Sequence, residues 1–341
     1  MIIRSKAPLR LGLAGGGTDT SPFSDQYGGA VLNATISLYS YASIIPRNDG
    51  KIVLRAIDRN ESYEFDSSEE LNIDGNLDLH KGVYNRIIKE FQKKKLSFEL
   101  STFVDAPAGS GLGTSSTLTV SILGAFEEWL KLPLGEYDLA HLAYEIERID
   151  LNMAGGKQDQ YAAAFGGFNF MEFYADDKVI VNPLRVKQDH IDELNANMVL
   201  YYTGTSRLSA SIIDAQTKNI NSKKEKSIEG MLKLKEQAQK MKESILKGDI
   251  PEVGRILDFG WKYKKQLASE ISNPLIDEIY DSAIAAGATG GKISGAGGGG
   301  FMMFFCPGNS RYQVIETLKK FGGQIKRFDF TSFGLKSWVA K

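Results

Sequence analysis

The sequence contains few of the residues that commonly carry metal or thiol chemistry. Among 341 residues there is one cysteine, Cys306, and three histidines, His80, His141 and His190. A single cysteine excludes an internal disulfide and a zinc site built from several thiolates. It ends the apolar run 301–306, which predicts a small buried side chain rather than a nucleophile. The histidines are far apart and match no HExxH motif, so a metalloprotease-type zinc site is excluded as well.

Neither sign of charge is in excess, and no apolar run is long. The 41 Lys and Arg residues balance 42 Asp and Glu residues, for a formal net charge of −1. This balance argues against nucleic acid or a membrane surface as a partner. No run approaches the ~20 apolar residues of a membrane span. Residues 1–8 contain charges and a proline where a signal peptide has an apolar block, so we expect a cytoplasmic protein.

Glycine, in contrast, is abundant and clustered. The chain has 35 glycines, and fourteen of them lie in the three short segments 12–17, 109–113 and 290–300. Glycine adopts positive φ angles without strain and lets a backbone come close to a ligand. The three clusters are therefore the first candidates for a functional site.

The pattern of apolar residues predicts an α+β protein with two domains. At roughly 100–200 residues per domain, the length fits an N-terminal domain of residues 1–190 and a C-terminal domain of residues 191–341. Strands and helices occur in both halves without regular βα alternation. Strands are expected at 2–13, 29–46, 51–66 (a hairpin), 97–104, 166–184, 197–203, 301–305, 324–330 and 334–339. Helices are expected at 79–93, 117–130, 137–150, from 157, and at 209–247, 251–270, 274–287 and 311–321.

Two familiar nucleotide-binding motifs can be tested against the glycine clusters. The Walker A motif requires a lysine that the segment 109–116 lacks, so a P-loop is excluded. The dinucleotide fingerprint GxGxxG is matched by Gly295, Gly297 and Gly300, but an apolar strand follows where a helix should begin. A Rossmann dehydrogenase is therefore not indicated.

The middle cluster has the properties of a phosphate site. Gly109, Gly111 and Gly113 lead into three hydroxyl residues, 114–116, and a long helix. The N-terminus of a helix offers unpaired N–H groups and the positive end of its dipole. The hydroxyls could bind phosphate or Mg²⁺, or could simply cap the helix; the residues alone leave both readings open.

Four charged residues complete the set of candidates. Glu147 lies on a predicted helix and Asp159 near the start of the next one, where capping would be its ordinary role. Lys6 and Arg10 are four residues apart on a predicted strand and so share one face, which could also be an exposed edge.

Together these segments resemble the GHMP kinase family, and three motifs occur in the family's order. The first is Lys6-Ala-Pro-Leu-Arg10 followed by Gly15-Gly-Gly-Thr-Asp19. The second is Pro107-Ala-Gly-Ser-Gly-Leu-Gly-Thr-Ser-Ser116, and the third is Lys292-Ile-Ser-Gly-Ala-Gly-Gly-Gly-Gly-Phe301. The resemblance covers almost the whole chain. It implies a ribosomal protein S5 domain 2-like N-terminal domain and a ferredoxin-like C-terminal domain.

The resemblance also implies the roles of individual residues. Asp159 would act on the substrate hydroxyl, with Arg10 and Lys6 beside it. Mg²⁺ would be held by Ser115 and Glu147, with Ser116 as the alternative hydroxyl. ATP would be bound by Pro107, Ala108, Gly109, Ser110, Gly111, Leu112, Gly113, Thr114, Ser115 and Ser116. Substrate would contact Gly17, Thr18, Asp19, Arg207, Gly295, Ala296, Gly297 and Gly298.

Within the family, the Ala-Gly-Gly-Gly-Thr-Asp form of the first motif is similar to that of a sugar-kinase branch. This implies an ATP- and Mg²⁺-dependent enzyme that phosphorylates the anomeric hydroxyl of a heptose 7-phosphate, as a monomer or homodimer. The alternatives are a kinase of an unphosphorylated sugar such as L-fucose and a catalytically silent binding protein of the same fold. A substrate phosphate needs cationic anchors, and the candidates are Arg10, Lys81, Arg86 and Arg207.

Overall fold

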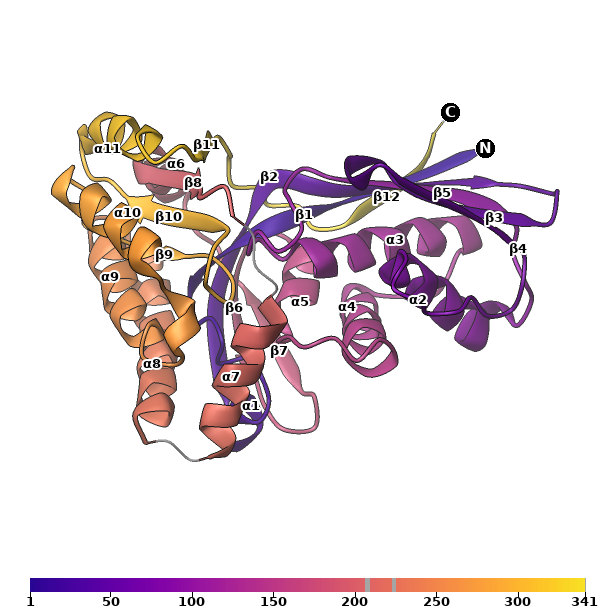
Figure 1. Cartoon of the computed structure of the whole chain (residues 1–341), viewed down its shortest axis with the longest axis horizontal. Coiled ribbons are helices and arrows are strands. Elements are labelled where there is room, and N and C mark those ends of the chain that lie inside the picture. The colour runs from indigo at the N-terminus through magenta and orange to yellow at the C-terminus, as the bar shows by residue number, and fades with distance from the viewer. Residues whose placement is uncertain (206–208, 223–224, 341) are drawn as a thin grey trace.

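The protein folds around two β-sheets of unequal size, as the computed structural model in Figure 1 shows. The structure describes residues 1–205, 209–222 and 225–340. The larger sheet has eight strands and the smaller has four. The mixed composition of both sheets and helices confirms the α+β prediction.

The larger sheet is built mostly from the N-terminal half of the chain. Its strands are β1 (Ile2–Ala14), β2 (Gly29–Pro46), β3 (Lys51–Ala56), β4 (Glu61–Asp66), β5 (Phe98–Val104), β6 (Phe168–Phe173), β7 (Val179–Pro183) and β12 (Lys336–Ala340). They run in the order β12-β1-β2-β5-β3-β4, and β6 pairs with β2 and with β7. The predicted hairpin 51–66 is confirmed as the antiparallel pair β3–β4.

Helices cover one face of this sheet (Figure 1). They are α2 (Asp78–Ile87), α3 (Thr114–Leu130), α4 (Glu136–Glu145) and α5 (Gln158–Phe165). The apolar residues of α3 recur at helical spacing, so Ile122 and Phe126 face the same way and are buried. The ring of Phe126 meets that of Phe98 edge to face, with centroids 5.3 Å apart, which joins α3 to β5 in one core.

The smaller sheet belongs to the C-terminal half and has helices packed against it. Its strands are β8 (Met198–Tyr202), β9 (Gly290–Ile293), β10 (Phe301–Phe305) and β11 (Gln324–Lys326), in the order β11-β8-β10-β9. The helices described outside the first group are α1 (Phe23–Tyr27), α6 (Gln188–Asn197), α7 (Ser209–Asn221), α8 (Glu225–Lys247), α9 (Glu252–Lys264), α10 (Pro274–Ala285) and α11 (Ser310–Lys319). The run 301–306, including Cys306, is fully buried, because β10 has apolar cores on both faces.

Two long strands, β1 and β2, connect the two halves of the molecule. The second half of β2 pairs with β5, whereas its first half pairs with β6. Leu9, Leu11 and Leu13 of β1 lie in one core with Met241 of α8 and Met303 of β10. The sheet of the N-terminal half therefore reaches under the smaller sheet, and the first glycine segment, at the end of β1, arrives between the two halves.

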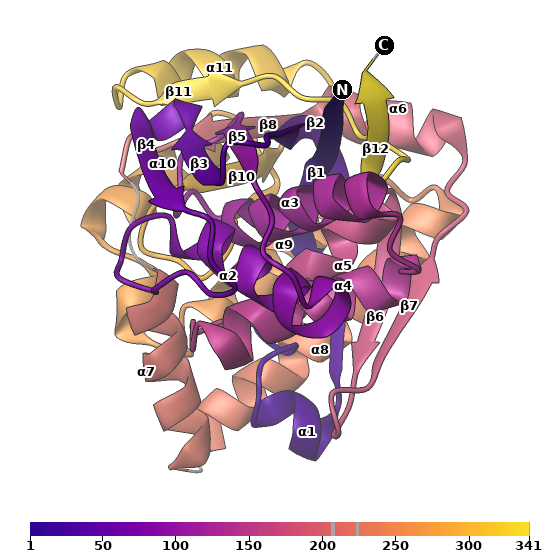
Figure 2. The same cartoon turned by 90° about the vertical axis from the view of Figure 1, so that its right-hand side faces the viewer.

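The last strand returns to the first sheet. β12 pairs antiparallel with β1, with Lys336 opposite Lys6 and Ala340 opposite Ile2. Figure 2 shows the two termini side by side at one end of the molecule. The chain segment predicted as C-terminal domain thus supplies a strand to the larger sheet, and the division at residues 190 and 191 remains a prediction.

Two predicted helices end in a wider turn than expected. The regions 79–93 and 137–150 begin as α2 and α4 and continue as π-helical turns at Ile88–Gln92 and Ile146–Asp150. The second turn carries Glu147, and its Leu151 N–H donates to the Ile146 carbonyl five residues back at 3.0 Å. Such turns are frequent at functional sites. Among the described helices, none is long and apolar enough to cross a membrane.

Candidate active site

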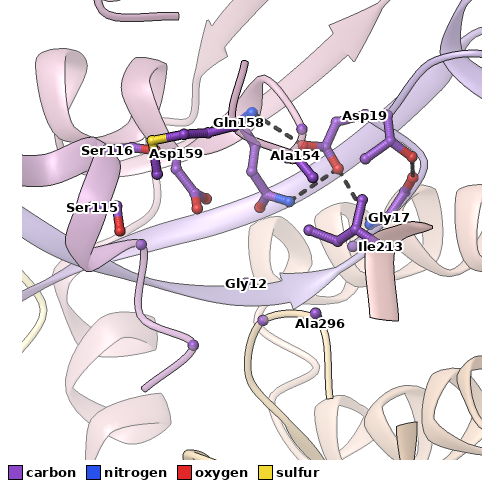
Figure 3. A pocket seen from close by; sticks show the side chains of 18 of the residues that line it. Gly12, Gly17, Asp19, Ser115, Ser116, Ala154, Gln158, Asp159, Ile213 and Ala296 are labelled. Carbon is purple, nitrogen blue, oxygen red and sulfur yellow. Dashed lines mark hydrogen bonds between the residues drawn. The ribbon is translucent and has the colours of Figure 1, made fainter. Parts of the chain in front are cut away.

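A cavity of about 990 Å³ lies where the two halves of the molecule meet. Residues of all three glycine segments line it, together with residues of α5, α7, α9 and the π-helical turn. Figure 3 shows Ser115 and Ser116 on one side of Asp159, and Asp19 and Gly17 on the other side. The glycine clusters, far apart in the sequence, therefore do form one site.

The second and third glycine segments are in direct backbone contact. A Cβ atom added to Gly111, whose φ is +87°, would lie 2.3 Å from the carbonyl oxygen of Ser294. A Cβ atom on Gly295 would lie 2.6 Å from the Cα of Gly111. The Phe301 N–H donates to the Ser110 carbonyl at 2.9 Å. Only glycine lets these segments approach so closely, so the excess of glycine at this point has a packing reason.

The second segment delivers the N-terminus of α3 to the cavity. Gly113 precedes the helix with a φ of +78°, and no side chain caps the helix. The Thr117 N–H is paired with the Gly113 carbonyl at 2.9 Å, while the N–H groups of residues 114–116 precede the first helical hydrogen bond. Thr114, Ser115 and Ser116 all line the cavity. Of the two readings left open, the anion site is favoured, because none of the three hydroxyls caps α3.

Asp159 and Arg10 form an ion pair inside the cavity. Nε of Arg10 donates to Oδ1 of Asp159 at 2.7 Å, and its Nη2 lies 2.6 Å from the same oxygen. Nη1 of Arg10 donates to the Gly111 carbonyl at 2.6 Å, which ties the pair to the second glycine segment. No hydrogen bond to Oδ2 of Asp159 is found among the described residues, so this oxygen can accept a proton or hydrogen bond from a ligand.

Glu147 provides a buried carboxylate beside Ser116. Its side chain is 0% exposed. Oε2 accepts from the hydroxyl of Ser116 at 2.8 Å and from Nε2 of Gln160 at 3.2 Å, and Nη1 of Arg148 lies at 3.1 Å. Oε1 has no partner among the described residues. Burial raises the pKa of the Glu147 carboxyl, and the Arg148 charge opposes this rise.

Asp19 joins the first glycine segment to the start of α5. Its Oδ1 accepts from the Gly17 N–H and from Nε2 of Gln158, and its Oδ2 accepts from the N–H groups of Lys157 and Gln158. Burial raises the pKa of the Asp19 carboxyl, as does the nearby Asp159 charge. Asp19 lines the cavity. It thereby ties the first glycine segment to the start of α5, the helix that carries Asp159.

Several predicted site residues are not brought to this cavity. Lys6 lies over the ring of Tyr39, 4.7 Å from its centroid, on a stretch of β1 separated from Arg10 by a register shift in the β1–β2 pairing. β1 is an inner strand, so Lys6 and Arg10 do not form a pair on an exposed sheet edge. The hydroxyl of Thr18 is buried against the backbone of Gly15 and Ala30. Arg207 lies outside the described residues. The other predicted residues absent from the cavity lining are Pro107, Ser110, Leu112, Gly297 and Gly298.

Two proposed phosphate anchors, Lys81 and Arg86, are engaged elsewhere. Nζ of Lys81 lies 2.6 Å from Oδ1 of Asp74. Arg86 pairs with Asp150 at 2.7 Å and with two further carboxylates. Both belong to α2, which packs against α3 and the π-helical turn rather than the cavity. Neither is therefore available to a ligand in this site.

Sequence patterns did not reveal two lysines that line the cavity, Lys264 and Lys292. Lys292 begins the third family motif and could have been noticed there. Lys264 stands among Lys262 and Lys265 at the end of α9, where nothing in the sequence separates a buried lysine from an exposed one.

A glycine-rich segment at a helix N-terminus, a buried carboxylate beside a hydroxyl, and a carboxylate held by arginine are compatible with phosphoryl transfer. The chain belongs to the GHMP kinase family: the GHMP kinases N terminal domain matches residues 78–167 and the GHMP kinases C terminal domain matches residues 241–324. This confirms the resemblance and the two-domain kinase fold.

Three similar proteins are named as sugar kinases. The D-glycero-alpha-D-manno-heptose 7-phosphate kinase of Campylobacter jejuni is 52% identical over 336 residues, 98% of each chain. A crystal structure of a D-glycero-D-manno-heptose 1-phosphate kinase from Bacteroides thetaiotaomicron is 47% identical, with a TM-score of 0.86 over 99% of both chains. The L-fucokinase/L-fucose-1-P guanylyltransferase of Bacteroides fragilis is 29% identical over 88% of this chain, which spans 34% of that longer protein.

Proposed function

We propose that this protein is a sugar kinase that transfers the γ-phosphoryl group of ATP to the anomeric hydroxyl of D-glycero-D-manno-heptose 7-phosphate, giving the 1,7-bisphosphate. The observation that carries the proposal is the 52% identity to a heptose 7-phosphate kinase along 98% of both chains. The cavity supports it with a free carboxylate oxygen on Asp159 beside an anion cradle.

The phosphates of ATP would lie on the second glycine segment. The N–H groups of residues 114–116 and the dipole of α3 would meet the phosphate charge. These donors are fixed by the contact of Gly111 with the third segment. Donors that are already in place stabilise charge that develops during transfer without reorganising.

The residues present fit a Mg²⁺ ion at the Glu147 end. Among the described residues no three His, Cys, Asp or Glu side chains converge on one point. Mg²⁺ often uses only one or two carboxylates, with phosphate and water oxygens completing the shell. Glu147 has a buried, unpartnered Oε1, and the hydroxyl of Ser116 lies 2.8 Å from its Oε2. Glu147 and Ser116 would therefore hold the ion, with Ser115 as the alternative hydroxyl. Bound Mg²⁺ neutralises charge on the phosphate oxygens.

The acceptor hydroxyl would bind at Oδ2 of Asp159. Nε and Nη2 of Arg10 both contact Oδ1 of Asp159, which leaves the other oxygen of the carboxylate for the cavity. Asp159 would accept the hydroxyl proton as the oxygen attacks the γ-phosphorus. Catalysis of phosphoryl transfer depends mainly on holding the two substrates in line.

The test is ATP consumption with a panel of acceptors. The purified protein should turn over the heptose 7-phosphate with a higher kcat/KM than the unphosphorylated heptose, L-fucose or galactose, and ³¹P NMR should locate the new ester at the anomeric carbon. A preference for L-fucose would replace the proposed substrate with the alternative one. No turnover of any sugar, with ATP bound, would indicate a silent binding protein.

A further inference from the structure

Four lysines of this chain are buried among the described residues, and they fall into two pairs. Lys81 and Lys157 each have a carboxylate beside the ammonium group, Asp74 at 2.6 Å and Asp177 at 2.7 Å. Lys264 and Lys292 are each 4% exposed. No carboxylate of the described residues forms an ion pair with either of them.

Both unpaired lysines line the cavity. Nζ of Lys292 donates to the carbonyl of Gly12 at 2.8 Å, and Nζ of Lys264 donates to the carbonyl of Gly295. An ammonium group has three donors, so each lysine has two beyond the bond described. Burial lowers the pKa of Lys264 to about 8 and lowers that of Lys292 well below its usual value. Arg10 adds a third positive charge, which lowers both pKa values further.

Burying ammonium groups without counter-charges is costly, and an anionic ligand would offset that cost. The acidic group that raises the pKa of Lys264 is Asp19. Both oxygens of Asp19 already accept two N–H bonds each. The other carboxylate nearby, Asp159, is paired with Arg10. The two lysines therefore form the part of the cavity with positive charge in excess.

This positive region lies between the first and third glycine segments, because Lys292 binds Gly12 of the first and Lys264 binds Gly295 of the third. Figure 3 shows Ala296, which follows the Gly295 bound by Lys264, on the Asp19 side of Asp159. The main charges acting on Glu147 are those of Arg148 and Asp159. The transferred phosphoryl group would be bound at the Glu147 end, whereas Lys292 lies at the first glycine segment, which leads to Asp19, the predicted sugar contact.

We infer that Lys264 and Lys292 bind an anionic group carried by the acceptor sugar at a distance from its reacting hydroxyl, and that this group is a phosphate ester. The inference rests on the proposed function and assigns its substrate phosphate to two residues. A phosphate ester suits the site because it carries close to two negative charges and several acceptor oxygens. Lysine binds phosphate as a point charge.

The experiment compares Lys264→Met and Lys292→Met with the wild-type enzyme on two acceptors, the heptose 7-phosphate and the same heptose without phosphate. Methionine keeps the length of the side chain and removes the charge. For each variant, kcat/KM for the phosphorylated acceptor should fall about 30- to 100-fold, the loss of a charged hydrogen bond. With the unphosphorylated acceptor it should change less than about threefold.

Lys262→Met is the matched control, because Lys262 lies on the same helix, is exposed and pairs with Asp258 at 2.6 Å. It should act like the wild type on both acceptors. Equal losses of both acceptors in Lys264→Met and Lys292→Met would overturn the inference and place the lysines on the transferred phosphoryl group or in the fold.

A second measurement uses the wild-type protein alone and so does not depend on the folding of a variant. Inorganic phosphite, added to the unphosphorylated heptose, should occupy the empty phosphate position and increase turnover in a saturable way. Absence of any activation would contradict the site.

Failure of the proposed function can be told apart from failure of the inference. If hexose 6-phosphates are better acceptors than the heptose 7-phosphate, and the lysine variants lose that preference, the heptose is wrong and the anion site stands. If the heptose 7-phosphate is turned over but both lysine variants keep their preference for it, the proposed function stands and the inference is wrong.

Discussion

At the scale of single residues, the two carboxylates of the site differ in the groups that contact them. Asp159 contacts arginine through one oxygen and leaves the other free, while Glu147 is fully buried with one oxygen unpartnered. The first arrangement suits a group that accepts a proton, and the second suits a metal ligand. We therefore expect the two carboxylates to have different roles.

The role of Asp159 can be tested by its conversion to asparagine. Asp159→Asn keeps the shape but removes the proton acceptor, so kcat should fall at least ~100-fold with little change in ATP affinity. Steady-state kinetics with saturating acceptor measures this. Asp176→Asn, in an exposed turn outside the cavity, is the control and should retain full activity. Near-normal turnover by Asp159→Asn would refute the assignment.

The choice between the two serines can be decided by removing each hydroxyl. Because the Ser116 hydroxyl donates to Glu147, Ser116→Ala should raise the Mg²⁺ concentration for half-maximal activity at least ~10-fold. Ser115→Ala should raise this Mg²⁺ concentration less than about threefold, because the hydroxyl bound to Glu147 is that of Ser116. Titration of activity with MgCl₂ at fixed ATP measures both, and the reverse ranking would assign the metal to Ser115.

At the scale of elements, the cradle is a contact between two loops rather than one loop. Gly111 touches Ser294 and Gly295, and Arg10 binds the Gly111 carbonyl. The N-terminus of α3 is positioned by this contact, and the π-helical turn places Glu147 opposite it. A change in the third segment is therefore expected to affect phosphate binding at the second.

This contact predicts a strong effect of one added methyl group. In Gly111→Ala the new Cβ would lie 2.3 Å from the Ser294 carbonyl oxygen, so the two segments must separate and kcat/KM should fall at least ~100-fold. The control is Gly75→Ala, at a φ of +93° with nothing within 4 Å of the added Cβ. It bears only the backbone strain, about 1–2 kcal/mol of stability, and should keep its activity. Urea denaturation and kinetics of both variants check this, and equal activities would contradict it.

At the scale of the whole molecule, the active site lies between two halves of the chain, and each half supplies residues to it. β1 and β2 extend from the larger sheet beneath the smaller one, while β12 returns from the C-terminal half to the larger sheet. The cavity draws Arg10, Asp159 and Glu147 from one half and Lys264 and Lys292 from the other. We therefore expect stability and ligand binding to be coupled through the buried charges.

The pH dependence of stability should reveal this coupling. Burial lowers the pKa of Lys264 from 10.5 to about 8, with Arg10 adding to the effect and Asp19 opposing it. Below pH 8 the folded protein holds a charged, buried lysine, so Lys264→Met should unfold with a free energy about 1–2 kcal/mol higher than the wild type. Between pH 8 and 10.5 the unfolded chain binds more protons than the folded one, and the wild type regains stability as the pH rises.

Urea denaturation of both proteins at pH 7, 8.5 and 10 measures this difference. The advantage of Lys264→Met should be greatest at pH 7 and smallest at pH 10. An advantage that is absent at pH 7, or that grows with pH, would show that burial of the Lys264 charge does not cost stability.

The sequence alone determined the features that depend on contiguous residues. The predicted phosphate-binding segment runs from Pro107 to Ser116, so its glycines and hydroxyls are recognisable from their order along the chain. The family, the α+β class and the positions of most helices and strands followed from patterns of the same local kind. The long glycine segments also predicted where backbone would need to come close.

The tertiary structure decided everything that depends on burial and on distant pairing. Arg10 and Asp159 are 149 residues apart in sequence, and only the fold makes one the partner of the other. The same holds for Lys6. The sequence pattern predicts it beside Arg10, but in the fold its ammonium group lies over the ring of Tyr39. Lysines on a helix look alike in sequence; what separates Lys264 from Lys262 is which face of α9 meets the cavity. The sequence specifies which residues are charged, but the free-energy cost of burying a charge depends on how the folded chain packs.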